Sequence, residues 1–577
     1  MKRFFSVLCT LLLCIPAFFA VMAETADDLF SDKDLTLADP SEAVDIVLTE
    51  GGVDITEPGV YRLSGQVADG SIRVAPATEG DVWLLLDGVS VHNEDGAALT
   101  SDGCDKLILT LAEGSVNSLT QGSATPAEED NDAAIYVRDD LTINGNGALT
   151  IESAWLDGIN CRDSLRIVSG DITVSAVDDG LVGKDEVTIG GGTITISAQT
   201  GDGIKATNAE DADRGFVAIA GGTLTITTGE GSASVSQTAS DGWGGRGGWE
   251  QQAEEDTPSQ KGVKAETTLT LSGGTLSIDS VDDALHAVDV TVSGGEMTLA
   301  AGDDGVHADN TLTVSGGTIT VTRSYEGLEG TDVTLSGGEI SITASDDGIN
   351  GAGGDSATSS DEGTFGASGR FGRDRFASST GTVHISGGVI SVSASGDGVD
   401  VNGDLEMTGG ELYVNGPESG GDGALDYDGS FTLTGGTVVA VGSAGMAQGV
   451  SDPSIPGTVM NASGSDVLEV LDSAGNVLIH FETLHAYSHA VLYSDRFTDG
   501  ETYTVTMGGN SQSVQMTTDS TGGMGFGGGR GGFGGGRRET PEAMPEGGSG
   551  ERPAREPGTA PESAPSEGES GSGEEKL

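Results

Sequence analysis

An acidic residue, a glycine and an aliphatic residue recur together along this chain about every 21 or 22 residues. The phrase reads Asp-Asp-Gly-Leu at 178–181, Asp-Asp-Gly-Val at 303–306 and Asp-Asp-Gly-Ile at 346–349. A glycine-rich phrase, such as Ser-Gly-Gly-Thr-Ile at 315–319, follows in the same repeat. A repeat this short, made of β-forming residues and turns with no helical period, is one coil of a solenoid. The sequence therefore predicts an all-β fold of stacked coils.

Stacking turns each position of the repeat into a column of side chains, because strands of neighbouring coils lie about 4.8 Å apart. The aliphatic column, which we expect to face the core, contains Ile159, Leu181, Ile204, Val263, Leu285, Val306, Leu328, Ile349 and Val399. Two positions earlier lies an acid column of Asp157, Asp179, Asp202, Asp283, Asp304, Glu326, Asp347 and Asp397, which we expect Asp422 to continue. The coil with Lys261 has no acid at this position. A second, partial acid column precedes the first at Asp178, Asp282, Asp303 and Asp346.

Stacked carboxylates at this spacing repel one another by roughly 1 kcal/mol per neighbour in water, so we expect a cation between them. Calcium binds carboxylate and carbonyl oxygens, which these columns supply. The predicted calcium ligands are Asp178, Asp179, Asp202, Asp282, Asp283, Asp303, Asp304, Asp346, Asp347 and Asp397, and the best pair of coils is Asp282-Asp283 above Asp303-Asp304. The alternative is that Asp-Gly is only turn chemistry. Turn preference alone should also have placed Asn or Ser in the column.

The residue after the aliphatic position points outward, and four of these residues are basic or imidazole side chains. Lys205, Lys264, His286 and His307 occupy this position in different coils, and we predict that they are neighbours that contact a ligand. Such a line beside the acid column suits sugar carboxylates. Two histidines among aspartates also meet part of the ligand requirement of zinc, although this signal is weak by itself. A solvated polar strip is the plain alternative.

The chain is strongly acidic, with 26 basic and 91 acidic side chains and a formal charge of −65. This charge excludes nucleic acid as a partner, because phosphate binding needs a basic surface. It also disfavours anionic membrane surfaces, and it suits a protein that meets divalent cations.

The chain divides into five segments. Residues 1–23 read as a signal peptide with a basic start, an apolar run and a small-residue cleavage site, so we expect a secreted, extracellular protein that can also associate with the cell surface. Residues 24–90 read as an N-terminal cap and first rungs, 91–451 as the β-helix, 452–517 as a small C-terminal β domain or cap, and 518–577 as a disordered acidic and glycine-rich tail. No later segment reaches 18 apolar residues, so we expect no membrane span in the mature protein. We expect a monomer.

Two insertions, at about 229–261 and 353–380, interrupt the period. Insertions in a solenoid emerge as loops that often border the binding face. The first contains Trp243 and Trp249, which we predict to contact the ligand.

The phrase Asp-Asp-Gly-Val-His-Ala at 303–308, followed by Leu-Thr-Val-Ser-Gly-Gly-Thr-Ile at 312–319, resembles the bacterial extracellular carbohydrate-binding β-helix family, which is related in fold to pectate lyases. The resemblance covers about residues 40–515. It implies a right-handed parallel β-helix that binds calcium through the Asp pairs named above. It also implies binding of plant cell-wall polysaccharide, with acidic pectin as the first candidate and cellulose as another.

Three functions remain open. We expect a non-catalytic polysaccharide-binding protein in which calcium bridges protein carboxylates to those of a uronate-rich polymer. A calcium-dependent polysaccharide lyase is the second hypothesis, and it needs a base, for which Arg323, Lys205 and Lys264 are the basic side chains on regular coils near the acid column. A structural surface adhesin, in which calcium only rigidifies the fold, is the third. We assign no catalytic residue.

Overall fold

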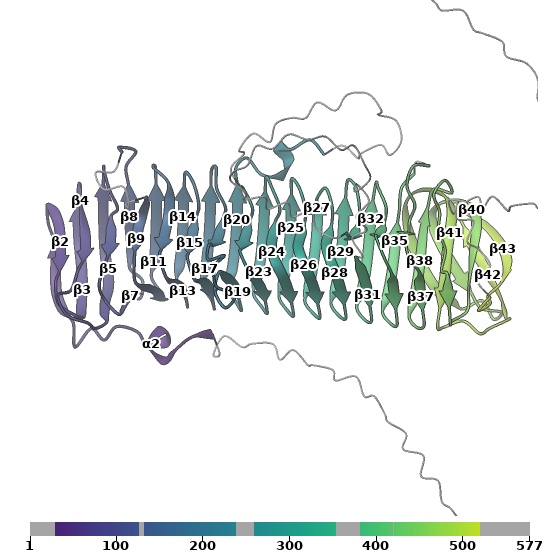
Figure 1. Cartoon of the computed structure of the whole chain (residues 1–577), viewed down its shortest axis with the longest axis horizontal. Coiled ribbons are helices and arrows are strands. Elements are labelled where there is room, and N and C mark those ends of the chain that lie inside the picture. Colours follow the sequence, from purple (N-terminus) through teal and green to yellow (C-terminus); the bar gives the residue numbers. More distant parts are fainter. Residues whose placement is uncertain (1–28, 126–131, 238–258, 353–380, 419, 520–577) are drawn as a thin grey trace, which may run out of the picture. The chain divides into compact units, whose positions relative to one another are not determined.

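Three short strands make one coil, and each strand pairs in parallel with its counterpart in the next coil. The computed structural model describes residues 29–125, 132–237, 259–352, 381–418 and 420–519. Leu285 pairs with Val306, and Val306 pairs with Leu328, so these coils are offset by 21 and 22 residues. Figure 1 shows the strands of successive coils side by side. The predicted all-β solenoid of parallel strands is confirmed.

The strands form three ladders that run from coil to coil. The first ladder contains β12 (Asp157–Cys161), β15 (Leu181–Gly183), β18 (Ile204–Ala206), β21 (Val263–Ala265), β24 (Leu285–Val292), β26 (Val306–Val314), β28 (Leu328–Leu335), β30 (Ile349–Gly351), β33 (Val399–Val401) and β36 (Asp426–Tyr427). The second contains β13 (Ser164–Ile167), β16 (Glu186–Ile189), β19 (Phe216–Ile219), β22 (Thr268–Leu271), the later halves of β24, β26 and β28, β31 (Thr382–Ile385), β34 (Leu405–Met407) and β37 (Phe431–Leu433). The third contains β14 (Asp171–Ala176), β17 (Thr193–Ala198), β20 (Thr223–Thr228), β23 (Thr275–Ser280), β25 (Glu296–Ala301), β27 (Thr318–Arg323), β29 (Glu339–Ala344), β32 (Val389–Ala394), β35 (Glu411–Asn415) and β38 (Thr437–Gly442).

The less regular N-terminal part of the sequence also forms parallel pairs. Its strands are β1 (Val44–Leu48), β2 (Gly51–Ile55), β3 (Gly59–Val67), β4 (Gly70–Val74), β5 (Val82–Asn93), β6 (Leu99–Ser101), β7 (Lys106–Leu111), β8 (Val116–Gln121), β9 (Ala133–Val137), β10 (Asp140–Gly145) and β11 (Ala148–Ser153). Strands β9, β10 and β11 pair with β12, β13 and β14, so the three ladders continue into this region.

Steric contact between the first and third ladders explains the glycine of the repeat. Every member of the aliphatic column has an exposed fraction of 0%. A Cβ atom on Gly158, one position earlier, would lie 2.3 Å from Val174 Cγ1. The same clash with a valine or isoleucine of the third ladder recurs at Gly180, Gly203, Gly262, Gly305, Gly327, Gly348 and Gly398. The coils with Ala284 and Ala424 in this slot have Leu299 and Ala440 at the facing position of the register. Alanine therefore occurs where the facing side chain is not β-branched.

An antiparallel segment follows the last coil. It consists of β40 (Gly457–Leu471), β41 (Val477–Ser494), β42 (Thr502–Met507) and β43 (Asn510–Gln515), and β41 pairs antiparallel with β38. Leu468, Val505 and Phe481 belong to a second apolar cluster, separate from that of the coils. The short strand β39 (Asp452–Pro453) precedes this segment.

A short N-terminal segment is fastened to the coils by a buried ion pair. Helix α2 (Asp32–Leu35) carries Asp34, whose Oδ1 lies 2.6 Å from the Nζ atom of Lys106 in β7. A single 3-10 turn, η1 (Ser232–Ser234), lies at the start of the first insertion. Within the described ranges, no helix is long and apolar enough to cross a membrane. The predicted signal peptide lies outside the described residues, as does nearly all of the predicted tail.

Asp422 does not continue the acid column, contrary to the prediction. The amide of Gly398 donates to the carbonyl of Gly423, and Asp400 pairs with Asp426. Gly423 therefore takes the column position. These two coils are offset by 26 residues because the connection between β35 and β36 is longer. The prediction matched Asp422-Gly423 to the Asp-Gly of the phrase, but the aliphatic Leu425 stands three positions after Asp422 instead of two.

Candidate functional site

Most acids of the column are tied to the backbone of the next coil through one carboxylate oxygen. Asp157 Oδ1 accepts a hydrogen bond from the amide of Asp179 at 3.1 Å, and Asp179 Oδ1 accepts one from the amide of Asp202 at 2.7 Å. The same contact joins Asp202 to Lys261, Asp283 to Asp304, Asp304 to Glu326, Asp347 to Asp397, and Asp397 to Gly423. Each bond satisfies a backbone amide that would otherwise need another partner. The turn-chemistry alternative thus accounts for Oδ1 and leaves Oδ2 for other partners.

In several coils Oδ2 meets a side chain three residues later. Lys205 Nζ lies 3.3 Å from Asp202 Oδ2 and 3.0 Å from Asp179 Oδ2. His286 Nδ1 lies 3.0 Å from Asp283 Oδ2, and His307 Nδ1 lies 2.9 Å from Asp304 Oδ2. The register places Lys205, Lys264, His286 and His307 on consecutive coils. The ammonium group of Lys264 lies 3.3 Å from Glu266 Oε1 instead, so within the described part of the chain three of the four side chains contact the acids of the column.

Lys261, the exception in the column, supplies a cation to its neighbours. Its Nζ lies 2.9 Å from Asp282 Oδ1 and 2.6 Å from Asp283 Oδ2. Burial opposes the ammonium charge, but the two carboxylates outweigh it and raise the pKa of Lys261. Burial alone would raise the pKa of Asp283, but His286 and Lys261 hold it well below its usual range. The expectation that the column is uncompensated without an added cation is therefore wrong for these coils, which include the pair predicted to be best for calcium.

A second stretch of the column has acids without such partners. Ligand oxygens of Asp347, Asp397 and Asp400 lie within 4.8 Å of one another, and among the described residues no Lys, Arg or His forms an ion pair with any of them. Burial and neighbouring carboxylates raise the pKa of Asp347 to about 7, of Asp397 to about 8 and of Asp400 to about 6. These three carboxylates hold protons more tightly than usual because burial and the neighbouring carboxylates outweigh the backbone amides that bond to them.

The remaining predicted residues are those of the second acid column and the two tryptophans of the first insertion. Asp178, Asp282, Asp303 and Asp346 directly precede acids of the column. Oxygens of Asp282, Asp283 and Asp303 lie within 4.8 Å of one another. Burial and the carboxylates of Asp283 and Asp282 raise the pKa of Asp303 to about 6. Trp243 and Trp249 lie outside the described residues.

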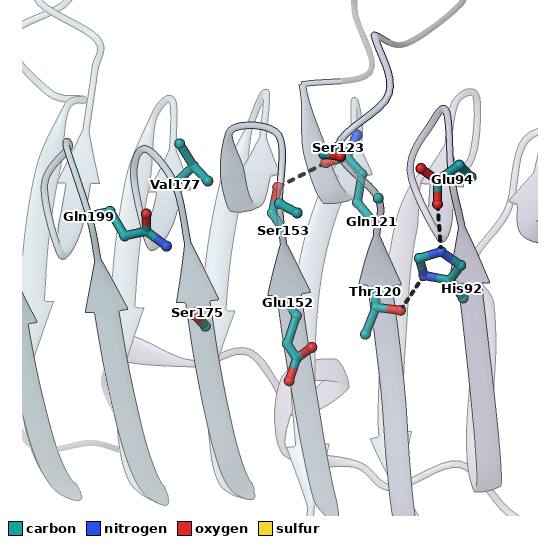
Figure 2. A pocket seen from close by; sticks show the side chains of 12 residues that line it. His92, Glu94, Thr120, Gln121, Ser123, Glu152, Ser153, Ser175, Val177 and Gln199 are labelled. Atoms are coloured by element: carbon teal, nitrogen blue, oxygen red, sulfur yellow. Dashed lines mark hydrogen bonds and ion pairs between the residues drawn. The ribbon is translucent and has the colours of Figure 1, made fainter.

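A pocket that was not predicted from the sequence crosses β5, β8, β11 and β14 (Figure 2). Its polar lining consists of His92, Glu94, Thr120, Gln121, Ser123, Glu152, Ser153, Ser175 and Gln199. His92 Nδ1 lies 2.9 Å from Thr120 Oγ1, and its Nε2 lies 3.3 Å from Glu94 Oε2. Hydroxyl, amide and carboxylate groups can all pair with sugar hydroxyls. The polar residues near the ends of these four strands could have indicated the pocket. The early repeats are degenerate, however, so the sequence did not show that these residues pair in neighbouring coils.

A family model and a curated relative both match this chain to a carbohydrate-binding family. A family model described as "Carbohydrate-binding domain-containing protein" matches residues 49–305 and 303–459. A protein of that name from Acetivibrio thermocellus is 38% identical over 149 residues, which are 25% of this chain and 51% of the relative. The chain thus spans about half the length of the curated relative that it matches. A solved structure of a polysaccharide lyase-like protein from C. thermocellum, a gadolinium derivative, is 28% identical with a TM-score of 0.35, covering 47% of this chain and 96% of that one. On the family match, this chain belongs to the carbohydrate-binding domain-containing proteins.

Proposed function

We propose that this chain is a secreted, non-catalytic receptor for a uronate-rich polysaccharide such as pectin, and that calcium mediates the binding. The observation that carries the proposal is the group of Asp347, Asp397 and Asp400, which converge with no cationic side chain of the described residues paired to them. Calcium binds six to eight oxygens, so three carboxylates satisfy part of its coordination and leave positions for further oxygens. A uronate carboxylate supplies such oxygens.

The contrast between two stretches of one column supports a role for a cation here. Between Asp179 and Asp304, the protein itself places Lys205, Lys261 and two histidines against the acids. At Asp347 and Asp397 the column continues, but Asn350 and Asp400 occupy the position three residues later. The Oδ1 atoms of both aspartates accept backbone amides at 2.7 and 2.6 Å, which fixes the carboxylates and leaves Oδ2 for a metal ion.

Calcium also resolves an electrostatic difficulty. A protein with a formal charge of −65 repels a polyanionic chain. A divalent ion shared between protein and polymer turns this repulsion into attraction at the point of contact. Asn350 and Asp400 pair in the register beside the acid column, so they lie next to the proposed ion.

The lyase hypothesis ranks second because its candidate bases are engaged elsewhere. Lys205 bridges Asp179 and Asp202, Lys264 faces Glu266, and Arg323 donates to the carbonyl of Val235 at 2.7 Å. Such pairing keeps a lysine charged, whereas a general base must be neutral. The adhesin hypothesis retains calcium and differs only in having no polymer ligand.

Retention of the purified protein on immobilised polygalacturonate separates the three functions. We expect retention with calcium, release by a chelator, and no rise in the absorbance of unsaturated uronates during prolonged incubation. Formation of unsaturated products would instead identify a lyase. Calcium-dependent stabilisation without any retention would contradict polymer binding and favour the adhesin. The polymer arms should include cellulose, as a neutral control.

A further inference from the structure

The part of the acid column next to the proposed calcium group contains a different set of ligand atoms. His307 Nδ1 lies 2.9 Å from Asp304 Oδ2 and 3.0 Å from Glu329 Oε2. Asp304, His307 and Glu329 each offer one ligand atom, and these three atoms lie within 4.8 Å of one another. The carboxylates come from neighbouring coils, because the register pairs His307 with Glu329. One imidazole nitrogen therefore faces two carboxylate oxygens.

Carboxylates flank the ring of His307 on both sides. The opposite nitrogen of the ring, His307 Nε2, lies 3.5 Å from Asp309 Oδ1, and two carboxylates face Nδ1. Asp304 is 5% exposed, so the protein rather than bulk water surrounds these ligand atoms.

We infer that Asp304, His307 and Glu329 form a site for a divalent transition-metal ion of the zinc type. An imidazole nitrogen with two carboxylates is a ligand set for zinc, cobalt or nickel, whereas calcium selects oxygen ligands alone. Ligand atoms around a tetrahedral zinc ion lie roughly 3.3–3.6 Å apart, given metal–ligand distances of about 2.0–2.2 Å. The separations of 2.9 and 3.0 Å between His307 Nδ1 and the two carboxylate oxygens need to open only by a few tenths of an ångström.

Asp309 completes the arrangement from behind the ring. A histidine that binds a metal through one nitrogen commonly donates the other N–H to a carboxylate, which fixes the tautomer and the ring orientation. Asp309 Oδ1 has this position relative to His307 Nε2. The side chains of His307 and Glu329 are 21% and 14% exposed, so a fourth ligand such as water or a sugar oxygen can approach from solvent.

The neighbouring group of Asp283, His286 and His307 is a poorer choice. Its atoms also lie within 4.8 Å, but Lys261 Nζ is 2.6 Å from Asp283 Oδ2, the same oxygen that contacts His286. A metal ion there would have to displace this ammonium group. The ammonium group of Lys261 pairs with Asp282 and Asp283 rather than with Asp304 or Glu329, so the Asp304–His307–Glu329 group does not meet that competition.

The test uses full-length protein without a histidine tag, stripped of metal and kept in excess calcium, and titrated calorimetrically with zinc chloride. We expect one tight zinc ion per chain that calcium does not displace. His307→Ala and Glu329→Gln should each weaken zinc binding at least about tenfold, the scale on which even supporting groups of metal sites act. Cobalt bound to the wild type should give the intense visible bands of a tetrahedral site, and both variants should lose them.

The matched control is His384→Ala, because His384 also lies in a regular coil with its Nδ1 3.4 Å from a carboxylate, that of Glu406. This variant should bind zinc like the wild type. Circular dichroism checks folding, and the isosteric Glu329→Gln variant decides if His307→Ala does not fold. Absence of tight zinc binding by the wild type would overturn the site. So would loss of zinc in His286→Ala with full retention in Glu329→Gln, because that result places the ion at Asp283. Neither result depends on calcium or polygalacturonate binding, so the zinc site and the proposed function can fail separately.

Discussion

Replacing Gly158 by alanine tests the steric relation between the first and third ladders. The new Cβ would lie 2.3 Å from Val174 Cγ1 and 2.6 Å from the carbonyl oxygen of Gly180. Overpacking of this kind costs about 1–3 kcal/mol. The lower entropy of alanine in the unfolded chain offsets about 0.4–1 kcal/mol of that. We therefore expect Gly158→Ala to lower the free energy of unfolding by about 1–2 kcal/mol.

The informative measurement is a double-mutant cycle with Val174→Ala. Val174 is 1% exposed, so its truncation should itself cost about 2 kcal/mol through lost burial and a small cavity. The double variant reproduces the native combination of Ala424 and Ala440. Removing the Cγ atoms removes the contact with Val174 and leaves the one with the Gly180 carbonyl oxygen, so the double variant should be more stable than the sum of the single changes by about 1 kcal/mol.

Urea unfolding followed by circular dichroism, with the slope of each transition checked for constancy, gives these energies. Gly420→Ala is the control, because its Cβ would find its nearest neighbours at 3.8 Å. It should leave stability nearly unchanged. Additive effects of Gly158→Ala and Val174→Ala would refute the steric explanation and leave the glycine column to another cause.

Three further outcomes are expected. Lys261→Ala should destabilise the protein by about 3 kcal/mol in urea unfolding, because it leaves buried Asp283 without its ammonium partner. Lys264→Ala should cost less than about 1 kcal/mol because its ion pair is more exposed, and equal effects of the two variants would contradict the role given to Lys261. The pKa values of Asp347 and Asp397 are raised to about 7 and about 8, so the folded metal-free protein binds more protons than the unfolded chain. Its urea midpoint should therefore fall as pH rises from about 4 to about 8, and a rising midpoint would contradict the buried surroundings given to these two carboxylates. Calcium should raise the melting temperature and a chelator should lower it. At a hundredfold excess of calcium over its dissociation constant, the stabilisation corresponds to about 2.7 kcal/mol. An unchanged melting temperature after verified metal removal would argue against a calcium site.

The sequence predicted the fold well because the period and the alternation of side chains are set locally. The aliphatic column is buried at every predicted position. A shift of one residue would turn these side chains outward, so the apolar pattern itself specifies the register. Asp422 was misplaced because the longer turn before it breaks the period, and its Asp-Gly pair was matched to the repeat one position out of register. The sequence shows glycine at position 158 and alanine at position 284 of the same column. The cause of this difference depends on which side chain of the third ladder faces each position, and that is known only from the structure.

The candidate site was predicted less completely because its chemistry depends on where each oxygen points. The spacing of three residues in Asp202–Lys205, Asp283–His286 and Asp304–His307 was present in the sequence, but only the geometry shows that the second residue reaches Oδ2 of the first. Lys261 follows an insertion of irregular length, so the repeat gave no reason to place its ammonium group against Asp282 and Asp283. Those contacts move the strongest case for calcium from the coils first favoured to Asp347, Asp397 and Asp400.

The proposal that calcium at these three residues recruits a uronate polymer is tested most directly by two matched double variants. Asp347→Asn with Asp397→Asn removes two of the proposed ligands, and Asp283→Asn with Asp304→Asn makes the same change where Lys261, His286 and His307 already pair with the acids. Asparagine oxygens can still accept the backbone amides in both variants, so both should fold. The measurement is the affinity for oligogalacturonate at saturating calcium, by titration calorimetry. The account predicts at least about a tenfold loss for the first variant and wild-type affinity for the second. Wild-type affinity in the first variant, or an equal loss in both, would contradict it.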